Sequence, residues 1–225
     1  MMSHPARETI SVKLVHALYE PAGSGPFPTI FAMHGWGSNA MDLQGLAPYI
    51  GDGRFLVICP QGPFDVEIGA INGYGWYQMR PGSQPDEEKV SAAVDSLRDF
   101  INEACTRYPV DQQKIVALGF SQGGMMAYNL AVRWPQKFAA LVGIATAFPE
   151  YLVDRVTNPE ALAKLPTMVQ HGRADEMLEI SRARKSVEML RKLGVTVAFH
   201  EYDGGHEVTA DGVRDLSRFL AKTIA

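Results

Sequence analysis

Short apolar runs alternate along the chain with longer segments in which apolar residues recur at every third or fourth position. The short runs are apolar at consecutive rather than alternate positions. A strand needs this pattern when helices cover both faces of its sheet, as in a parallel α/β sheet. The runs of this kind are 29–33, 55–59, 115–118, 140–144 and 167–169. The more mixed segment 9–19 predicts an edge strand or hairpin, and the alternating segment 195–202 predicts the last strand.

The segments between these runs carry the helical period. Residues 86–108 form one apolar stripe, with Val90, Val94, Leu97 and Ile101 among its members. The same spacing predicts further helices at 122–134, around 183–190 and at 213–224. Strands that alternate with helices predict an α/β fold with one mostly parallel, doubly wound sheet flanked by helices.

Composition narrows the class of protein. With 225 residues, 46% of them hydrophobic and 20% charged, the chain suits one domain, 1–225, and leaves little room for a separate lid domain. The net charge of −4 provides no excess of Lys and Arg for a phosphate backbone, which argues against nucleic acid as a partner. Cys59 and Cys105 lie in apolar patterns and are expected to be reduced thiols. We expect a cytoplasmic protein without a signal peptide or membrane span, because no stretch reaches ~18 apolar residues.

Two segments, 60–85 and 147–165, fit neither pattern and are rich in Gly, Pro and aromatic residues. We expect them to be long loops, and loops of this length in a compact domain are usually functional. Each begins where a predicted strand ends. Ligands of open α/β sheets bind beyond the carboxyl ends of the strands, so both segments are predicted to border the functional site.

The segment Gly119-Phe120-Ser121-Gln122-Gly123 has the pattern Gly-x-Ser-x-Gly. It directly follows one predicted strand and directly precedes a predicted helix. This strand–turn–helix setting is that of the nucleophile elbow, in which a tight turn projects the serine hydroxyl above the sheet. We expect side chains at 119 and 123 to collide across the turn. The alternative is a glycine-rich turn with an idle serine.

A serine hydroxyl is a weak nucleophile and needs a base, which in this arrangement follows both the serine and an acid along the chain. Three histidines follow Ser121. His200 lies within the last strand pattern, and His171 ends a strand, where we expect it to shape the turn. His206 lies in the glycine-rich segment 203–207 between the last strand and the last helix, and is the predicted base.

Asp175 is the predicted acid, because it follows a strand between the nucleophile and the base. Its carboxylate would accept the second imidazole N–H and stabilise the imidazolium. Glu176 is the nearest competitor. Asp203 and Glu207 flank the base and are expected to be solvated, and Asp154 is a more distant alternative.

Two backbone N–H groups are needed to stabilise the oxyanion of acyl transfer. One should come from Gln122, the residue after the nucleophile. The other should come from Trp36, because the glycines of segment 34–38 let that backbone approach the substrate. His34 precedes the serine and is expected to brace its own turn.

These motifs resemble those of the phospholipase/carboxylesterase family, which includes small carboxylesterases and acyl-protein thioesterases. The resemblance spans nearly the whole chain, and Phe-Ser-Gln-Gly-Gly is more specific than the bare Gly-x-Ser-x-Gly pattern. Four segments carry it in the family's order: His34-Gly35-Trp36-Gly37, 119–124, His171-Gly172 with Asp175, and Gly205-His206. The resemblance implies the α/β-hydrolase fold and a triad of Ser121, Asp175 and His206. It places the oxyanion amides at Trp36 and Gln122.

The residues Gly75-Trp76-Tyr77 resemble the tryptophan-containing segment that lines the acyl pocket of this family. The resemblance therefore assigns Trp76 and Tyr77 to substrate binding, and Met177 joins them as an apolar candidate beside the acid. Family members often carry Val-Pro shortly after the acid, where this chain has Met-Leu-Glu. Because that region borders the substrate, acyl-chain preference does not carry over.

These residues predict a serine carboxylesterase that hydrolyses small to medium acyl esters, aryl esters included, through an acyl-enzyme intermediate. Its partner is a small-molecule ester, and the mechanism needs neither a metal nor an organic cofactor. The same triad also serves thioesterases, lysophospholipases and peptidases, which differ in the leaving group. A binding protein that has lost catalysis is a second alternative, although such a protein usually lacks a triad residue. A homodimer is a further candidate assembly, although no long apolar seam demands one.

Overall fold

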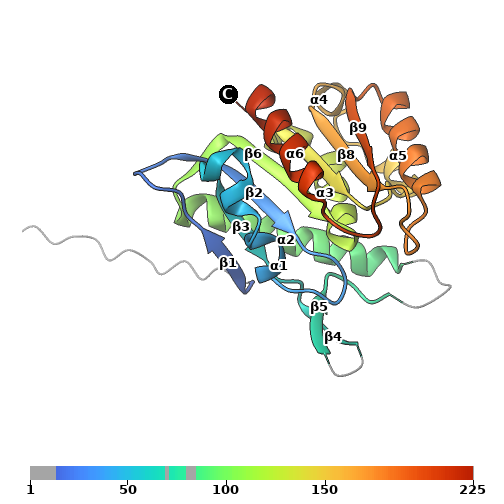
Figure 1. Cartoon of the computed structure of the whole chain (residues 1–225), viewed down its shortest axis with the longest axis horizontal. Helices are drawn as coiled ribbons and strands as arrows, with labels where there is room; N and C mark the ends of the chain where they lie inside the picture. Colours follow the sequence, from blue (N-terminus) through green and yellow to red (C-terminus); the bar gives the residue numbers. More distant parts are fainter. Residues whose placement is uncertain (1–13, 69–70, 80–84, 225) are drawn as a thin grey trace, which may run out of the picture.

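A seven-stranded sheet runs through the centre of the molecule, as the computed structural model of the chain shows for residues 14–68, 71–79 and 85–224 (Figure 1). In chain order its strands are β1 (His16–Tyr19), β2 (Phe27–Met33), β3 (Leu56–Pro60), β6 (Val110–Phe120), β7 (Ala140–Ile144), β8 (Thr167–Gly172) and β9 (Val197–Tyr202). The spatial order is β1-β3-β2-β6-β7-β8-β9. β1 pairs antiparallel with β3, and every other neighbouring pair is parallel. The mostly parallel α/β sheet predicted from the apolar runs is confirmed.

Helices cover both faces of this sheet (Figure 1). One face carries α2 (Glu87–Arg107), α3 (Gln122–Arg133), α4 (Pro159–Ala163) and α5 (Ile180–Lys192), and the other carries α1 (Met41–Gln44) and α6 (Ala210–Thr223). Adjacent residues of β2 therefore face different cores. Phe31 packs into the core that contains Leu97 of α2, whereas Ile30 packs into the core that contains Leu220 of α6. This two-sided burial is the reason that the strands are apolar at every position.

The ends of the predicted helices follow from local chemistry. Helix α2 begins after Asp86, whose carboxylate accepts hydrogen bonds from the amides of Glu88 and Lys89 at 3.1 and 3.3 Å. Helix α3 ends before Pro135, which cannot continue it. Helix α5 is followed by Gly194 at φ 83°, a left-handed conformation that glycine adopts without a Cβ penalty.

Three expectations for the less regular segments are corrected or limited by the structure. The segment 60–85, expected to be a loop, contains a hairpin of β4 (Phe64–Ile68) and β5 (Ile71–Gly75). The segment 147–165 contains α4 and the 3₁₀ helix Glu150–Arg155. The expected edge strand within 9–19 is β1, and residues 9–13 lie outside the described part of the chain. Shorter 3₁₀ helices lie at Ala47–Tyr49, Gly51–Gly53 and Pro135–Lys137.

The hairpin β4–β5 is attached to the loop that follows β2. The amide of Tyr74 donates to the carbonyl of Ser38 at 2.7 Å, and the amide of Gly37 donates to the carbonyl of Tyr74 at 2.8 Å. A side chain at Gly73 would overlap the carbonyl of Gly37, so glycine permits this close approach. The glycines that obscured the strands in the sequence are therefore explained by a tertiary contact.

We expect Leu97→Ala to destabilise the protein by about 2–5 kcal/mol, because Leu97 is fully buried between α2 and the sheet and its removal leaves a cavity. Urea unfolding followed by circular dichroism measures the change. Asn102→Ala, at an exposed position on the same helix, is the control and should stay within about 0.5 kcal/mol of wild type. Equal losses in the two variants would contradict the assignment of this helix face to the core.

Candidate active site

Three of the predicted site residues lie at one edge of the sheet. Ser121 follows β6, Asp175 lies in the loop after β8, and His206 lies in the loop after β9. Strands β6, β7, β8 and β9 are parallel neighbours, so their carboxyl ends meet at the same edge. The topology thus brings together residues that are 85 positions apart in the chain.

Ser121 occupies a strained turn between β6 and α3. Its φ of 53° and ψ of −118° lie in a region that side-chain-bearing residues rarely adopt, at a cost of about 1–3 kcal/mol. The turn is held by two hydrogen bonds: the Ser121 amide donates to the Ile144 carbonyl at 2.9 Å, and the Thr146 hydroxyl donates to the Ser121 carbonyl at 2.8 Å. Although Ser121 precedes the helix, its hydroxyl makes no capping bond and is available for another contact.

Glycine is required on both sides of this serine, for different reasons. A Cβ at Gly119 would overlap the carbonyl of Gly123, so a side chain at 119 would collide across the turn as expected. A Cβ at Gly123 would instead overlap the Met33 carbonyl and lie 2.6 Å from the carbonyl oxygen of His34. Space at position 123 is therefore limited by the end of β2 rather than by the turn itself.

A chain of hydrogen bonds links Ser121, His206 and Asp175. The Ser121 hydroxyl lies 2.9 Å from Nε2 of His206, and Nδ1 of His206 lies 2.8 Å from Oδ2 of Asp175. With Nδ1–H donating to the carboxylate, Nε2 is left to accept the hydroxyl proton. The imidazole also packs against Phe120, with ring centroids 5.0 Å apart. This is the geometry of a serine activated by a histidine that an aspartate orients.

The Asp175 side chain is fully buried yet well supplied with donors. Its Oδ1 accepts hydrogen bonds from the amides of Met177 and Leu178 at 2.9 and 2.8 Å. Burial by itself raises the pKa of Asp175, but the Leu178 amide together with the hydrogen bond and charge of His206 outweigh it and hold that pKa below its ordinary value. The group therefore remains a carboxylate near neutral pH.

The other acidic candidates lie apart from the base. Glu176 and Asp154 are exposed. Asp203 pairs with Arg173 at 2.6 Å, and the Glu207 carboxylate accepts a hydrogen bond from the Gly205 amide at 3.2 Å. Among the described residues, Asp175 is the carboxylate that contacts His206.

The segment that contains Trp36 lies directly against the nucleophile. A Cβ added at Gly35 would lie 3.3 Å from Cβ of Ser121, so this backbone passes close to the hydroxyl. Gln122 begins α3, where helix N–H groups have no partner within the helix and the helix dipole favours negative charge. Its side chain is occupied elsewhere: Oε1 accepts from the Trp76 amide and Nε2 donates to the Tyr77 carbonyl, each at 2.9 Å.

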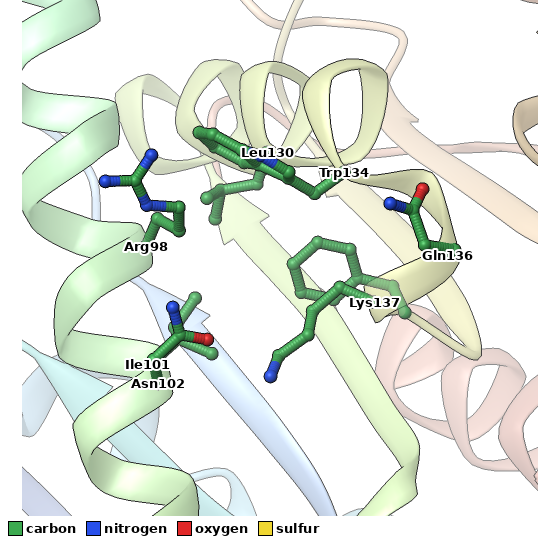
Figure 2. A pocket seen from close by; sticks show the side chains of 8 residues that line it. Arg98, Ile101, Asn102, Leu130, Trp134, Gln136 and Lys137 are labelled. Carbon is green, nitrogen blue, oxygen red and sulfur yellow. The ribbon is translucent and has the colours of Figure 1, made fainter. Parts of the chain in front are cut away.

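A hollow of about 220 Å³ lies between α2 and α3 (Figure 2). Its lining residues are Arg98, Ile101, Asn102, Leu130, Trp134, Gln136, Lys137 and Phe138. Trp134 follows the last residue of α3, whereas Ser121 precedes its first residue, and a helix of this length spans roughly 18 Å. The lining contains no nucleophile paired with a base, so the catalytic geometry belongs to the edge that carries Ser121.

Residues 20–224 match the model of the family described as Phospholipase/Carboxylesterase. The chain belongs to this family. The resemblance noted from the motifs is confirmed, and the protein is a carboxylic ester hydrolase of the serine-esterase type with an α/β-hydrolase fold.

Relatives and solved structures cover most of the chain. Acyl-protein thioesterase 1 of Gibberella zeae is 24% identical over 222 residues, which cover 91% of this chain and 94% of that protein. The putative hydrolase MhqD of Bacillus subtilis is 26% identical over 183 residues, covering 80% and 86%. The Bacillus cereus carboxylesterase superposes with a TM-score of 0.79 at 22% identity, covering 94% of this chain and 95% of that one. Zea mays acyl-protein thioesterase 2 has a TM-score of 0.75 at 21% identity, covering 93% and 98%. These two structures share the fold of the enzyme.

The aromatic residues assigned to substrate binding lie in the interior of the enzyme. Trp76 and Tyr77 are each only 1% exposed. The Trp76 indole donates to the His34 carbonyl at 2.9 Å, and the Tyr77 hydroxyl lies 3.1 Å from the sulfur of Met125. In this structure both aromatic side chains therefore pack in the interior. Met177, two residues after the acid Asp175, is by contrast 79% exposed.

The other histidines of the enzyme differ in their distance from the triad. His34 braces its turn as expected, with Nδ1 2.7 Å from the Gly35 carbonyl and Nε2 accepting from the Gly62 amide at 3.0 Å. His200 lies on β9 and pairs with Asp215 at 3.1 Å. His171, expected only to shape a turn, lies 3.2 Å from Oδ2 of Asp175.

The sequence reasoning assigned neither His171 nor Thr146 to the site. Thr146 carries no recognisable motif, so its contact with the Ser121 carbonyl could not be anticipated. His171 precedes Asp175 by four residues at the end of a strand, and that spacing was the signal available for it. Within the described ranges, no group of three or more His, Cys, Asp or Glu side chains is arranged to hold a metal ion. No helix of the described residues has the length and apolar character that a membrane crossing requires.

We expect Asp175→Asn to change how stability depends on pH. The pKa of Asp175 is lower in the folded than in the unfolded state. Its stabilising contribution is therefore complete above the unfolded value of about 4 and is lost as the pH falls through the lower folded value. The free energy of unfolding is measured in urea between about pH 2.5 and 7. As the pH falls, it should decrease more steeply for wild type than for the variant, so the difference between the two proteins should become smaller.

Asp154→Asn, at an exposed position, is the control for the substitution itself, and its stability at pH 7 should stay within about 0.5 kcal/mol of wild type. Parallel curves for wild type and Asp175→Asn would show that Asp175 is not the ionised, hydrogen-bonded group that the geometry indicates.

Proposed function

We propose that the enzyme is a serine carboxylesterase in which Ser121 is the nucleophile, His206 the general base and acid, and Asp175 the group that orients His206. The observation that supports this assignment is the unbroken hydrogen-bond chain from the Ser121 hydroxyl through both imidazole nitrogens to a buried carboxylate. A serine in a strained turn at a helix N-terminus is a further support, because each feature directs the hydroxyl and favours developing negative charge.

The proposed reaction has two acyl-transfer steps. Ser121 Oγ attacks the ester carbonyl carbon while Nε2 of His206 takes the hydroxyl proton, and the carbonyl oxygen becomes an oxyanion stabilised by the amides of Trp36 and Gln122. The intermediate collapses, the bond to the leaving oxygen breaks, and His206 transfers its proton to the departing alcohol. Water then attacks the acyl-enzyme with His206 again as base, which releases the carboxylic acid and restores the serine.

Small to medium acyl esters are the proposed substrates, and acyl thioesters are the second candidate. The nucleophile, base and oxyanion donors act on the acyl carbonyl, which esters and thioesters share, so the same residues suit both. The thioester alternative is favoured by relatives of Gibberella zeae and Candida albicans that carry the name acyl-protein thioesterase 1. The two differ in the leaving atom, so the choice between them rests on the exposed rim around the triad, where Met177 lies.

Ser121→Ala should reduce kcat for a short p-nitrophenyl ester by about 10³- to 10⁶-fold, because the variant has no nucleophile although the oxyanion amides remain. Steady-state kinetics with circular dichroism measure the activity and the fold together. Ser181→Ala, an exposed serine on α5, is the matched control and should keep wild-type activity. If wild type hydrolysed no ester and did not react with a fluorophosphonate, the proposal would fail and a binding role would take its place.

Matched ester, thioester and amide substrates with one acyl group separate the remaining candidates. We expect kcat/KM for the ester and the thioester to exceed that for the amide, because an amine is a poorer leaving group than an alcohol or a thiol. An amide turned over faster than its matched ester would overturn the esterase assignment in favour of a peptidase.

A further inference from the structure

His171 is a fully buried histidine that contacts the proposed catalytic carboxylate of Asp175. It is the second-last residue of β8 (Thr167–Gly172), and its side chain has no exposed surface. Its Nε2 lies 2.7 Å from the carbonyl oxygen of Leu178 and 3.2 Å from Oδ2 of Asp175. Oδ2 is the same oxygen that accepts the hydrogen bond from Nδ1 of His206.

The surroundings of the His171 ring determine which nitrogen carries the hydrogen. Nε2 faces two oxygens that can only accept, so it must be the protonated nitrogen. It donates its hydrogen bond to the Leu178 carbonyl at 2.7 Å, and Oδ2 of Asp175 lies beside the same N–H at 3.2 Å. Nδ1 is buried and has no hydrogen-bond partner among the described residues. The polar contacts of the ring are therefore made by Nε2 alone.

This one N–H group closes the turn that presents the carboxylate. Asp175 Oδ1 accepts from the amides of Met177 and Leu178, which bends the chain back on the aspartate. His171 contacts both ends of that turn: it donates to the Leu178 carbonyl at its end, and its Nε2 lies 3.2 Å from the carboxylate at its start. One carboxylate oxygen thus accepts from two amides, and the other accepts from His206 and lies beside the N–H of His171.

We propose that His171 is a positioning residue for the acyl-transfer reaction, whose Nε2–H fixes the Asp175 carboxylate and limits its hydrogen-bond basicity toward His206. This inference rests on the proposed function, because it acts through the triad. It predicts two effects of losing the N–H. The turn loosens, so His206 is less well aligned with Ser121. Oδ2 also loses the polar N–H group that lies beside it, so it stabilises the protonated form of His206 more strongly.

The charged groups around the two imidazoles support a direct effect of His171 on His206 through Asp175. Among the described residues, Asp175 is the charged group in contact with both His171 and His206. The neighbouring acids are engaged elsewhere: Asp203 pairs with Arg173, and Glu207 accepts from the Gly205 amide. The effect of removing the His171 N–H on the titration of His206 should therefore pass through the shared carboxylate oxygen.

Three substitutions at this position separate the N–H group from the bulk of the ring. His171→Leu removes the donor and keeps an apolar side chain. His171→Gln keeps an amide N–H at about the reach of Nε2. His171→Asn is polar like Gln but one methylene shorter, and it provides the comparison if the Leu variant does not fold. The matched control is His200→Leu. His200 lies on the adjacent strand β9, away from the triad, and pairs with Asp215 at 3.1 Å.

For each protein, kcat and KM for a short p-nitrophenyl ester are measured across pH, together with the rate of fluorophosphonate labelling and the circular dichroism spectrum. We expect His171→Leu and His171→Asn to lower kcat roughly 10- to 100-fold, with KM within about threefold of wild type. Their acidic limb of kcat/KM should move to higher pH, because a more basic His206 loses its proton later. His171→Gln should restore kcat to within about threefold, and His200→Leu should leave both kcat and the limb in place.

The outcomes distinguish this inference from the proposed function. If wild type neither hydrolyses the ester nor labels with the fluorophosphonate, the triad assignment itself fails. If wild type is active and labels, but all folded His171 variants match it or lose activity equally without a shift of the acidic limb, His171 only fills space and the inference is overturned.

Discussion

The tight packing of the turn after β6 is the constraint on which the rest of the site depends. The chain leaves a buried strand and enters α3 within one residue, and Ser121 achieves this at φ 53° and ψ −118°. Backbone carbonyls occupy the space that side chains at 119 and 123 would need, so the turn cannot relax by widening. Strain of this kind persists only where the surroundings over-determine it, and here the bonds from Thr146 and to Ile144 do so.

The electrostatics of the site follow from the burial of one carboxylate. Without donors, a buried aspartate would take up a proton and could no longer orient an imidazolium. Asp175 instead stays ionised because backbone amides of its own turn and two histidines surround it. The interactions thus form an ordered series: the turn holds the carboxylate, the carboxylate holds His206, and His206 faces the hydroxyl of Ser121. The orientation of each of these groups is fixed by the preceding one, so the arrangement is pre-organised.

The apolar runs and the order of the motifs predicted most of this architecture, because a strand buried on both faces has few other sequence patterns. The run 140–144 is β7 residue for residue, and His206 was selected among three histidines because it lies in a glycine-rich loop between the last strand and the last helix. The hairpin β4–β5 escaped the pattern because Gly73 is required by contact with a distant loop rather than by the strand. The burial of Trp76 was equally invisible, since an aromatic residue beside glycine suits a pocket wall or an interior brace.

Gln122 joins the unpredicted hairpin to the predicted nucleophile. Its backbone starts α3 directly after Ser121, while its buried side chain binds the amide of Trp76 and the carbonyl of Tyr77. Both polar ends of that side chain have hydrogen-bond partners in the interior. Displacing the residues that follow the hairpin, Trp76 and Tyr77, would therefore leave buried donors and acceptors without partners. The exposed side chain of Met177, two residues after Asp175, is different, because it is 79% exposed and lies outside this network. Substitutions at such exposed loop positions cost little stability. Under the proposed assignment, substrate choice can therefore change at exposed positions such as 177 while the strained turn, the buried carboxylate and the contacts of Gln122 stay in place.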